Sequence, residues 1–272
     1  MLPHELLAHL DQAQLWPVRP DAAPHFGDVA AAYQRALAVR SLRQARGERA
    51  MGFKIGFTNR TIWERYRVFA PIWGTVWNST LAYADSQGRG VLSLVGTCQP
   101  RIEPECVFGL RGAPPANASL DQLAASIAWV APGFEVVQTH CLNWQFHAAE
   151  TVADGGLHAR LLVGPPVLLD DSDRPSASAL ATRLASARVH LMCDERDVDS
   201  GVGANVLDSP LHALHHFLRE LRACPGAPDL QAGDVVTTGT WTDAWPVKAG
   251  QRWRARYEGT LPGMDSLVVT FE

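Results

Sequence analysis

Lysine is almost absent from this chain: of 24 basic residues only Lys54 and Lys248 are lysines. Arginine keeps its proton in a protein, whereas a buried lysine can release one. Lys248 stands in a polar turn, which predicts a solvated side chain. Lys54 stands in the apolar segment 51–57, where burial would disfavour the ammonium form and lower its pKa. We therefore expect Lys54 to be a catalytic acid or base, the alternative being a strand lysine that reaches solvent.

An excess of positive charge is also lacking. The net charge is -4 at pH 7, and phosphate contacts need a basic surface, so a nucleic acid partner is not expected. Residues 1–15 include Glu5 and Asp11 and contain no long apolar run. Neither a signal peptide nor a membrane anchor is expected there. The five cysteines are odd in number and match no zinc or redox spacing, so we expect a reducing, cytoplasmic location.

No internal repeat and no regular alternation of strand and helix patterns is present, which disfavours a doubly wound parallel sheet. Hydrophobic residues make up 47% of the 272 positions and charged residues 19%, which is typical of a globular protein with a large core. Capping residues and apolar periodicity predict helices from Asp28 to Gly47, from Ser119 to about Val130, and from Ser209 onward. Residues 188–198 indicate a hairpin around Asp194 and Glu195.

The segment 100–108 alternates in polarity. Glu103 and Glu105 point to one face of a strand, roughly 7 Å apart, the rise of two strand residues. Pro104 cannot donate to a ladder, so the segment is expected to be an edge strand or a bulged one. A solvated polar face with Arg101 as the counter-charge is the alternative interpretation.

A third carboxylate favours a metal site. Glu135 lies in the apolar segment 131–137 without an adjacent basic residue, so it is expected to be buried and to need a partner. Three carboxylates suit a hard divalent cation, Mg²⁺ or Mn²⁺. His140 follows Glu135 closely and is a candidate second acid or base, the alternative being a structural histidine.

Several motifs together resemble a known family. They include Gly-Phe-Lys-Ile-Gly-Phe-Thr at 52–58, Arg-Ile-Glu-Pro-Glu at 101–105, Glu-Val-Val at 135–137 and Thr-Val-Ala-Asp at 151–154, with further matches at 127–134, 199–203 and 232–239. The chain resembles the 2-keto-4-pentenoate hydratase / 4-oxalocrotonate decarboxylase family of the fumarylacetoacetate hydrolase superfamily. The resemblance implies an α+β fold, with a largely helical part at 1–80 that includes the Lys54 strand and a mixed β-sandwich roll at 81–272.

The resemblance also implies roles for single residues. Glu103, Glu105 and Glu135 would hold the metal, and Lys54 would be the acid or base in the pocket. Members of the family usually carry Ser-Arg where Thr139 and His140 stand, and Asn where Gly155 stands. An acidic residue is common near Asn78 and Ser79. The residues expected to contact substrate are Arg101, Gln138, Ser79 and Thr240.

The function that follows is that of a metal-dependent lyase in aromatic compound catabolism. It would add water to a 2-hydroxydienoate, derived from a small 2-oxo acid, through an enolate stabilised by the metal's charge. Decarboxylation of an oxalocrotonate and C–C bond hydrolysis of a diketo acid are alternatives from the same superfamily. A fourth alternative is a non-catalytic paralogue that assembles with an active relative. A homo-oligomer is expected, with the small substrate as ligand and no membrane partner.

Overall fold

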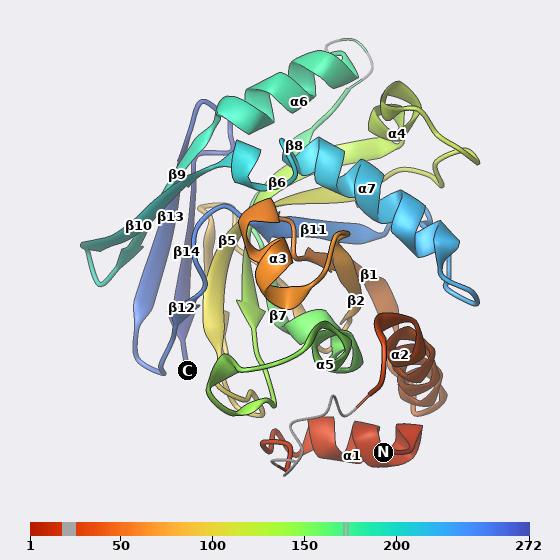
Figure 1. Cartoon of the computed structure of the whole chain (residues 1–272). Coiled ribbons are helices and arrows are strands. Elements are labelled where there is room, and N and C mark those ends of the chain that lie inside the picture. Colours follow the sequence, from red (N-terminus) through yellow and green to blue (C-terminus); the bar gives the residue numbers. More distant parts are fainter. Residues whose placement is uncertain (18–25, 171, 173) are drawn as a thin grey trace.

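Two β-sheets form the centre of the molecule, and helices surround them (Figure 1). This computed structural model describes residues 1–17, 26–170, 172 and 174–272. The helices are α1 Pro3–Asp11, α2 Val29–Ala45, α3 Trp63–Tyr66, α4 Leu120–Ala125, α5 Ala148–Ala153, α6 Ala177–Ser186 and α7 Pro210–Ala223, with 3-10 turns η1 Arg60–Ile62, η2 Leu142–Trp144, η3 Gly155–Leu157 and η4 Gly203–Asn205. The strands are β1 Ala50–Gly56, β2 Ile72–Trp77, β3 Leu81–Tyr83, β4 Arg89–Leu92, β5 Arg101–Leu110, β6 Ile127–Val137, β7 His158–Val163, β8 Val167–Leu168, β9 Arg188–Cys193, β10 Arg196–Val202, β11 Val235–Thr240, β12 Trp245–Pro246, β13 Arg252–Glu258 and β14 Ser266–Phe271.

The larger sheet carries the candidate site. Within the described residues its strands run in the order β2-β1-β11-β5-β6-β7-β3, with β12 beside β5 and β8 beside β6. β1 pairs with β11 in parallel, while β11 with β5 and β5 with β6 are antiparallel. Lys54 on β1 and the glutamates on β5 and β6 therefore come from neighbouring strands. Strands from both expected parts, 1–80 and 81–272, share this one sheet.

The smaller sheet, β10-β9-β13-β14-β4, packs against the larger one. Trp253, Ala255 and Tyr257 on β13 are buried, while the residues between them are exposed, as expected for a strand with one face on the core. The Tyr257 hydroxyl lies 2.9 Å from the Glu105 carbonyl oxygen, to which it donates. The mixed β roll expected from the sequence is confirmed.

Two of the predicted helices and the hairpin are confirmed. The Asp28 side chain accepts a hydrogen bond from the Ala31 amide at 2.7 Å and starts α2, which ends at Ala45. The Ser209 side chain caps α7, whose inward face packs on β11, β1 and β2. β9 and β10 form the hairpin, with Asp194 and Glu195 in its turn at positive φ.

Two expectations about local structure are wrong. The helix predicted from Ser119 ends at Ala125, because the β-branched and aromatic residues that follow pair with β5 as strand β6. Of the two alternatives for the segment that carries Pro104, the edge strand is wrong, since β5 is an interior strand, whereas a bulge does occur in its pairing with β11. The neighbouring strand accommodates this proline by a bulge between Thr237 and Thr240.

Across the described ranges, no helix combines the length and the apolar character needed to cross a bilayer. All five cysteines lie within those ranges and carry free thiols.

Candidate metal centre and active site

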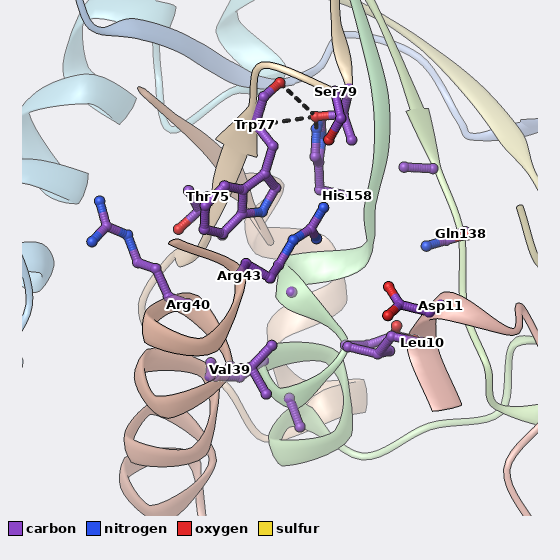
Figure 2. Close-up of a pocket in the computed structure, with 18 of the residues that line it drawn as sticks. Leu10, Asp11, Val39, Arg40, Arg43, Thr75, Trp77, Ser79, Gln138 and His158 are labelled. Atoms are coloured by element: carbon purple, nitrogen blue, oxygen red, sulfur yellow. Dashed lines mark hydrogen bonds between the residues drawn. The ribbon is translucent and has the colours of Figure 1, made fainter. Parts of the chain in front are cut away.

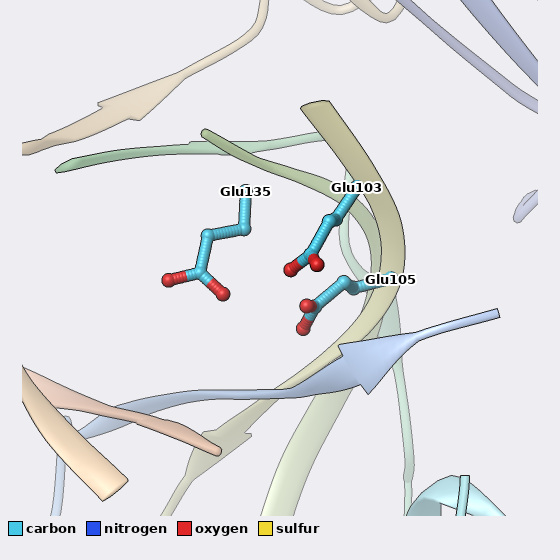
Figure 3. A group of neighbouring side chains, drawn as sticks. All are labelled: Glu103, Glu105 and Glu135. Carbon is cyan, nitrogen blue, oxygen red and sulfur yellow. The ribbon is translucent and has the colours of Figure 1, made fainter. Parts of the chain in front are cut away.

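Three carboxyl groups converge on one side of the larger sheet (Figure 3). Glu103 on β5 and Glu135 on β6 are direct cross-strand partners, and Glu105 is two residues further along β5. One carboxylate oxygen from each of the three glutamates lies within 4.8 Å of the others. Glu105 and Glu135 are fully buried, and Glu103 is partly exposed. The expectation that these side chains meet on one face is confirmed.

The protein holds one oxygen of each buried carboxylate. Glu105 Oε2 accepts hydrogen bonds from the Gly239 amide, at 2.7 Å, and from the Thr237 hydroxyl. The bulge in β11 directs the Gly239 amide to this position. Glu135 Oε1 is bound by His158 Nδ1 at 2.8 Å.

The second oxygen of each buried carboxylate accepts no such hydrogen bond within the described residues. Glu105 Oε1 and Glu135 Oε2 have no hydrogen-bond partner in the part of the chain that the structure describes. Buried carboxylate oxygens without a partner are costly. Two such atoms beside a third carboxylate fit the oxygen ligands that a divalent cation prefers.

Electrostatics also favour a cation at this point. Burial, with the neighbouring carboxylates, raises the pKa of Glu103 well above its usual value. Burial likewise raises the pKa of Glu105 to about 8 and that of Glu135 to about 7. These carboxyl groups therefore hold protons at a pH where exposed glutamates are ionised. A divalent cation would supply the charge that allows all three to ionise.

Lys54 is buried beside the glutamates. Its Nζ donates to the Gly156 carbonyl at 2.8 Å and lies 3.2 Å from Glu135 Oε2. The expectation of a lowered pKa is wrong for this arrangement. Burial does lower the pKa of Lys54, but the charges of Glu135, Glu103 and Glu105 outweigh it, and the pKa is raised. Lys54 is thus a protonated group at the site.

A pocket of about 240 Å³ leads to this cluster, with Lys54, Arg101, Glu103 and Thr240 among its lining residues. The Arg101 guanidinium lies over the Trp144 ring, 4.1 Å from its centroid. Phe57 and Phe146 add further aromatic lining, and their ring centroids are 6.4 Å apart. The pocket therefore combines cationic groups, a carboxylate cluster and apolar rings on a scale that suits a small acid.

Three expected site residues lie outside this pocket. His140 is fully buried, its Nδ1 lies 2.6 Å from Asp154 Oδ1, and its ring stacks on Trp16. Asp154 binds the ring and the backbone amide of His140 together, which keeps this side chain in the core. Its expected role as a second acid or base is therefore not supported by its position.

Gln138 and Ser79 line a separate cavity of about 310 Å³ between α1, α2, α5 and β2 (Figure 2). Val137 lines the site pocket, and strand alternation turns Gln138 to the other side. Gln138 Oε1 accepts from the Cys98 amide at 3.0 Å. Ser79 lies in the turn after β2, with its hydroxyl 3.2 Å from Glu48 Oε2.

The sequence interpretation missed His158. This residue begins β7, and its side chain is buried. Nδ1 contacts Glu135, and Nε2 lies 2.8 Å from the Thr80 hydroxyl. Burial, together with the charges of Lys54, Arg43 and Arg160, holds the pKa of His158 well below its usual value. The signal available in the sequence was a histidine at the start of an apolar strand.

Comparison with known proteins places this site in a family. The model of the fumarylacetoacetate (FAA) hydrolase C-terminal family matches residues 80–265. The chain belongs to this family. A 2-keto-4-pentenoate hydratase of Paraburkholderia phymatum is 32% identical over 261 residues, which cover 93% of each chain. A 2-hydroxyhexa-2,4-dienoate hydratase of Comamonas testosteroni is 30% identical and covers 88% of this chain and 85% of its own length.

A solved structure shares the fold. The 4-oxalocrotonate decarboxylase from Pseudomonas putida G7, complexed with magnesium and adipate, has a TM-score of 0.84 and 23% sequence identity. The alignment covers 99% of this chain and 95% of that chain. The family match includes the three glutamates and His158, while Lys54 comes from a strand that precedes the match.

Proposed function

We propose that this FAA hydrolase family member is a divalent-metal-dependent hydro-lyase acting on a small 2-oxo acid. The reaction that we assign is water addition to a 2-hydroxydienoate, in the manner of a 2-keto-4-pentenoate hydratase. The observation that carries the proposal is the glutamate cluster at the end of a small pocket, where Glu105 Oε1 and Glu135 Oε2 accept no hydrogen bond within the described residues and Lys54 is the ion-pair partner of Glu135. The hydratase names of relatives with 30% identity or more support the same reaction.

Glu103, Glu105 and Glu135 are the residues that would hold Mg²⁺ or Mn²⁺, because their donor set is entirely carboxylate oxygen. When bound, the cation supplies positive charge where negative charge develops on the 2-oxygen of the substrate. The magnesium in the related decarboxylase structure supports this choice.

Other residues of the pocket bind the acid and move a proton. Lys54 is protonated and buried, and we assign it the delivery of a proton to a substrate carbon during tautomerisation. Arg101 and Thr240 line the same pocket and are assigned contacts with the polar groups of the substrate. Phe57 and Phe146 line the same pocket and are assigned apolar contacts with the hydrocarbon part of the substrate.

Decarboxylation of an oxalocrotonate is the second candidate reaction. The pocket lining includes the guanidinium of Arg101, a group suited to a second carboxylate on a dicarboxylic 2-oxo acid. The structural neighbour named 4-oxalocrotonate decarboxylase supports this alternative.

Turnover of three substrates by the purified chain tests the assignment. With Mg²⁺ we expect 2-hydroxypenta-2,4-dienoate to be consumed without release of carbon dioxide, and EDTA to stop the reaction. Faster consumption of 4-oxalocrotonate with carbon dioxide release would replace hydratase by decarboxylase. Cleavage of a diketo acid alone would indicate a hydrolase. No turnover on any of the three, with Mg²⁺ bound, would make the chain a non-catalytic partner of a related enzyme.

We also propose that the chain assembles as a cytoplasmic homo-oligomer. Five free thiols support a reducing compartment. Sedimentation of the purified chain measures its assembly, and a monomer at micromolar concentration would contradict the proposal.

A further inference from the structure

His158 stands where strand pairing is irregular. The register between β6 and β7 shifts between Val136 and Val137, and Val137 pairs with His158. Such a bulge re-aims side chains. Here the His158 ring contacts both Glu135 at the carboxylate cluster and Thr80 at the wall of the second cavity.

Hydrogen-bond partners determine which ring nitrogen carries a proton. When a bound cation ionises Glu135, its carboxylate can only accept, so the Nδ1 atom 2.8 Å from Glu135 Oε1 is then the donor. Nε2 is left to face the Thr80 hydroxyl at 2.8 Å. That hydroxyl also contacts the Trp77 amide and carbonyl, at 3.0 and 3.1 Å, so it is itself held in place.

This chain of contacts orients a buried carboxylate that also forms an ion pair with Lys54. Glu135 Oε1 is bound by His158, whereas Glu135 Oε2 has no hydrogen-bond partner within the described residues and lies 3.2 Å from Lys54 Nζ. Without the imidazole, the ammonium group would be free to draw the whole carboxylate toward itself. With it, the carboxylate keeps an orientation in which one of its oxygens lies within 4.8 Å of oxygens of Glu103 and Glu105.

We propose that His158 is a positioning residue for the metal site: its Nδ1–H fixes the orientation of the Glu135 carboxylate for cation binding. Thr80 fixes the imidazole in turn. The role rests on the proposed divalent-metal function, and it adds a residue outside the carboxylate cluster to the determinants of metal affinity. Partners that bind metal ligands in this way typically change metal affinity by about 10- to 100-fold when removed.

Calorimetric titration of the metal-free chain with Mg²⁺ and Mn²⁺ tests the proposal. His158→Leu removes the donor and should weaken binding of both cations by about 10- to 100-fold. His158→Asn keeps a nitrogen donor on Cγ, where Nδ1 stands, and should recover most of that loss. His190→Leu, on β9 and 35% exposed, is the matched control and should leave affinity unchanged.

Melting curves in EDTA separate positioning from folding. If His158→Leu is folded and binds both cations as tightly as wild type, the role of His158 is refuted while the metal site stands. The same holds if His158→Asn is as weak as His158→Leu. If His158→Leu does not fold, Thr80→Val replaces it, and unchanged affinity there refutes the proposal. If the wild-type chain binds neither cation, the proposed metal function fails and the role of His158 fails with it.

Discussion

Three charged residues of the site, Glu105, Glu135 and Lys54, accept from or donate to different kinds of groups. Backbone and hydroxyl donors hold Glu105, an imidazole holds Glu135, and a carbonyl oxygen holds Lys54. This arrangement suggests a reason why a lysine, and not an arginine, occupies position 54. A guanidinium would also balance the three carboxylates, but it could not transfer a proton.

Replacing Lys54 separates charge from proton transfer. Lys54→Arg keeps the positive charge but not the transferable proton, and Lys54→Met removes both. We expect both variants to lose turnover by about 100- to 10,000-fold, the usual contribution of a proton-transfer group. The rise in melting temperature caused by Mg²⁺ should persist in Lys54→Arg. Near-normal turnover of Lys54→Arg would show that only the charge matters.

Neutralising one glutamate should affect the metal-free and the metal-bound chain in opposite ways. In the metal-free chain, Glu103→Gln replaces a carboxyl group that burial and the neighbouring carboxylates already keep protonated, so the melting temperature should stay the same, or rise at a pH where Glu103 is ionised. The same change removes a proposed ligand, so added Mg²⁺ should no longer raise the melting temperature. A rise as large as that of wild type would exclude Glu103 as a ligand.

The raised carboxyl pKa values predict a pH dependence. Unfolding returns Glu105 and Glu135 from pKa values of about 8 and about 7 to their ordinary value of 4.5, so the folded chain binds more protons. Metal-free stability should therefore fall as the pH rises from 4.5 toward about 8. Bound metal needs ionised ligands, so the Mg²⁺-induced rise in melting temperature should grow over the same range. Melting curves at several pH values, with EDTA or Mg²⁺, measure both trends. If the difference in melting temperature between the Mg²⁺ and EDTA samples does not change with pH, the raised pKa values of Glu105 and Glu135 are contradicted.

At the scale of elements, close backbone contacts place the site. A Cβ on Gly74 in β2 would lie 1.9 Å from the Gly155 carbonyl oxygen. Only glycine lets η3 approach β2 closely enough for the Gly156 carbonyl to reach Lys54. A second backbone contact places Glu105. Because β11 lies beside β5 and is bulged, the Gly239 amide reaches the Glu105 carboxylate.

The Gly74 contact can be tested by adding one methyl group. Gly74→Ala should push η3 away, destabilise the chain by about 1–3 kcal/mol, as overpacking does, and reduce turnover because Lys54 loses its acceptor. Gly155→Asn is the matched control. Its φ of +65° is tolerated by asparagine, and its Cβ would meet no atom within 4 Å. Urea unfolding and turnover of both variants give the comparison, and equal stability of the two would refute the explanation.

At the scale of the whole molecule, one sheet joins the N-terminal part to the rest. β1 lies between β2 and β11 and carries Lys54. Removing residues 1–80 would leave β11, which contains the buried Val235 and Val236, as an edge strand.

We therefore predict that residues 81–272 do not fold alone, although the family match begins at residue 80. The fragment should aggregate or show no cooperative melting by circular dichroism, in contrast to the full chain. A soluble fragment with a sharp transition would show that the β roll is an independent domain.

Local sequence patterns were sufficient to single out the glutamates and the lysine of the candidate site. Alternation placed Glu103 and Glu105 on one face, the apolar surroundings of Glu135 predicted its burial, and the rarity of lysine singled out Lys54. Capping residues predicted where α2 and α7 begin. In each case neighbours along the chain were sufficient.

Only the tertiary structure decided which distant residues meet. The pairing of β6 with β7 brought His158 to Glu135, and strand alternation took Gln138 out of the pocket. The contact between His140 and Asp154 keeps the His140 side chain in the core. The pKa of Lys54 was likewise set by carboxylates on other strands, which reversed the effect expected from its apolar neighbours. Spacing along one strand fixes a side chain's face, but register and bulges between strands fix what that face meets.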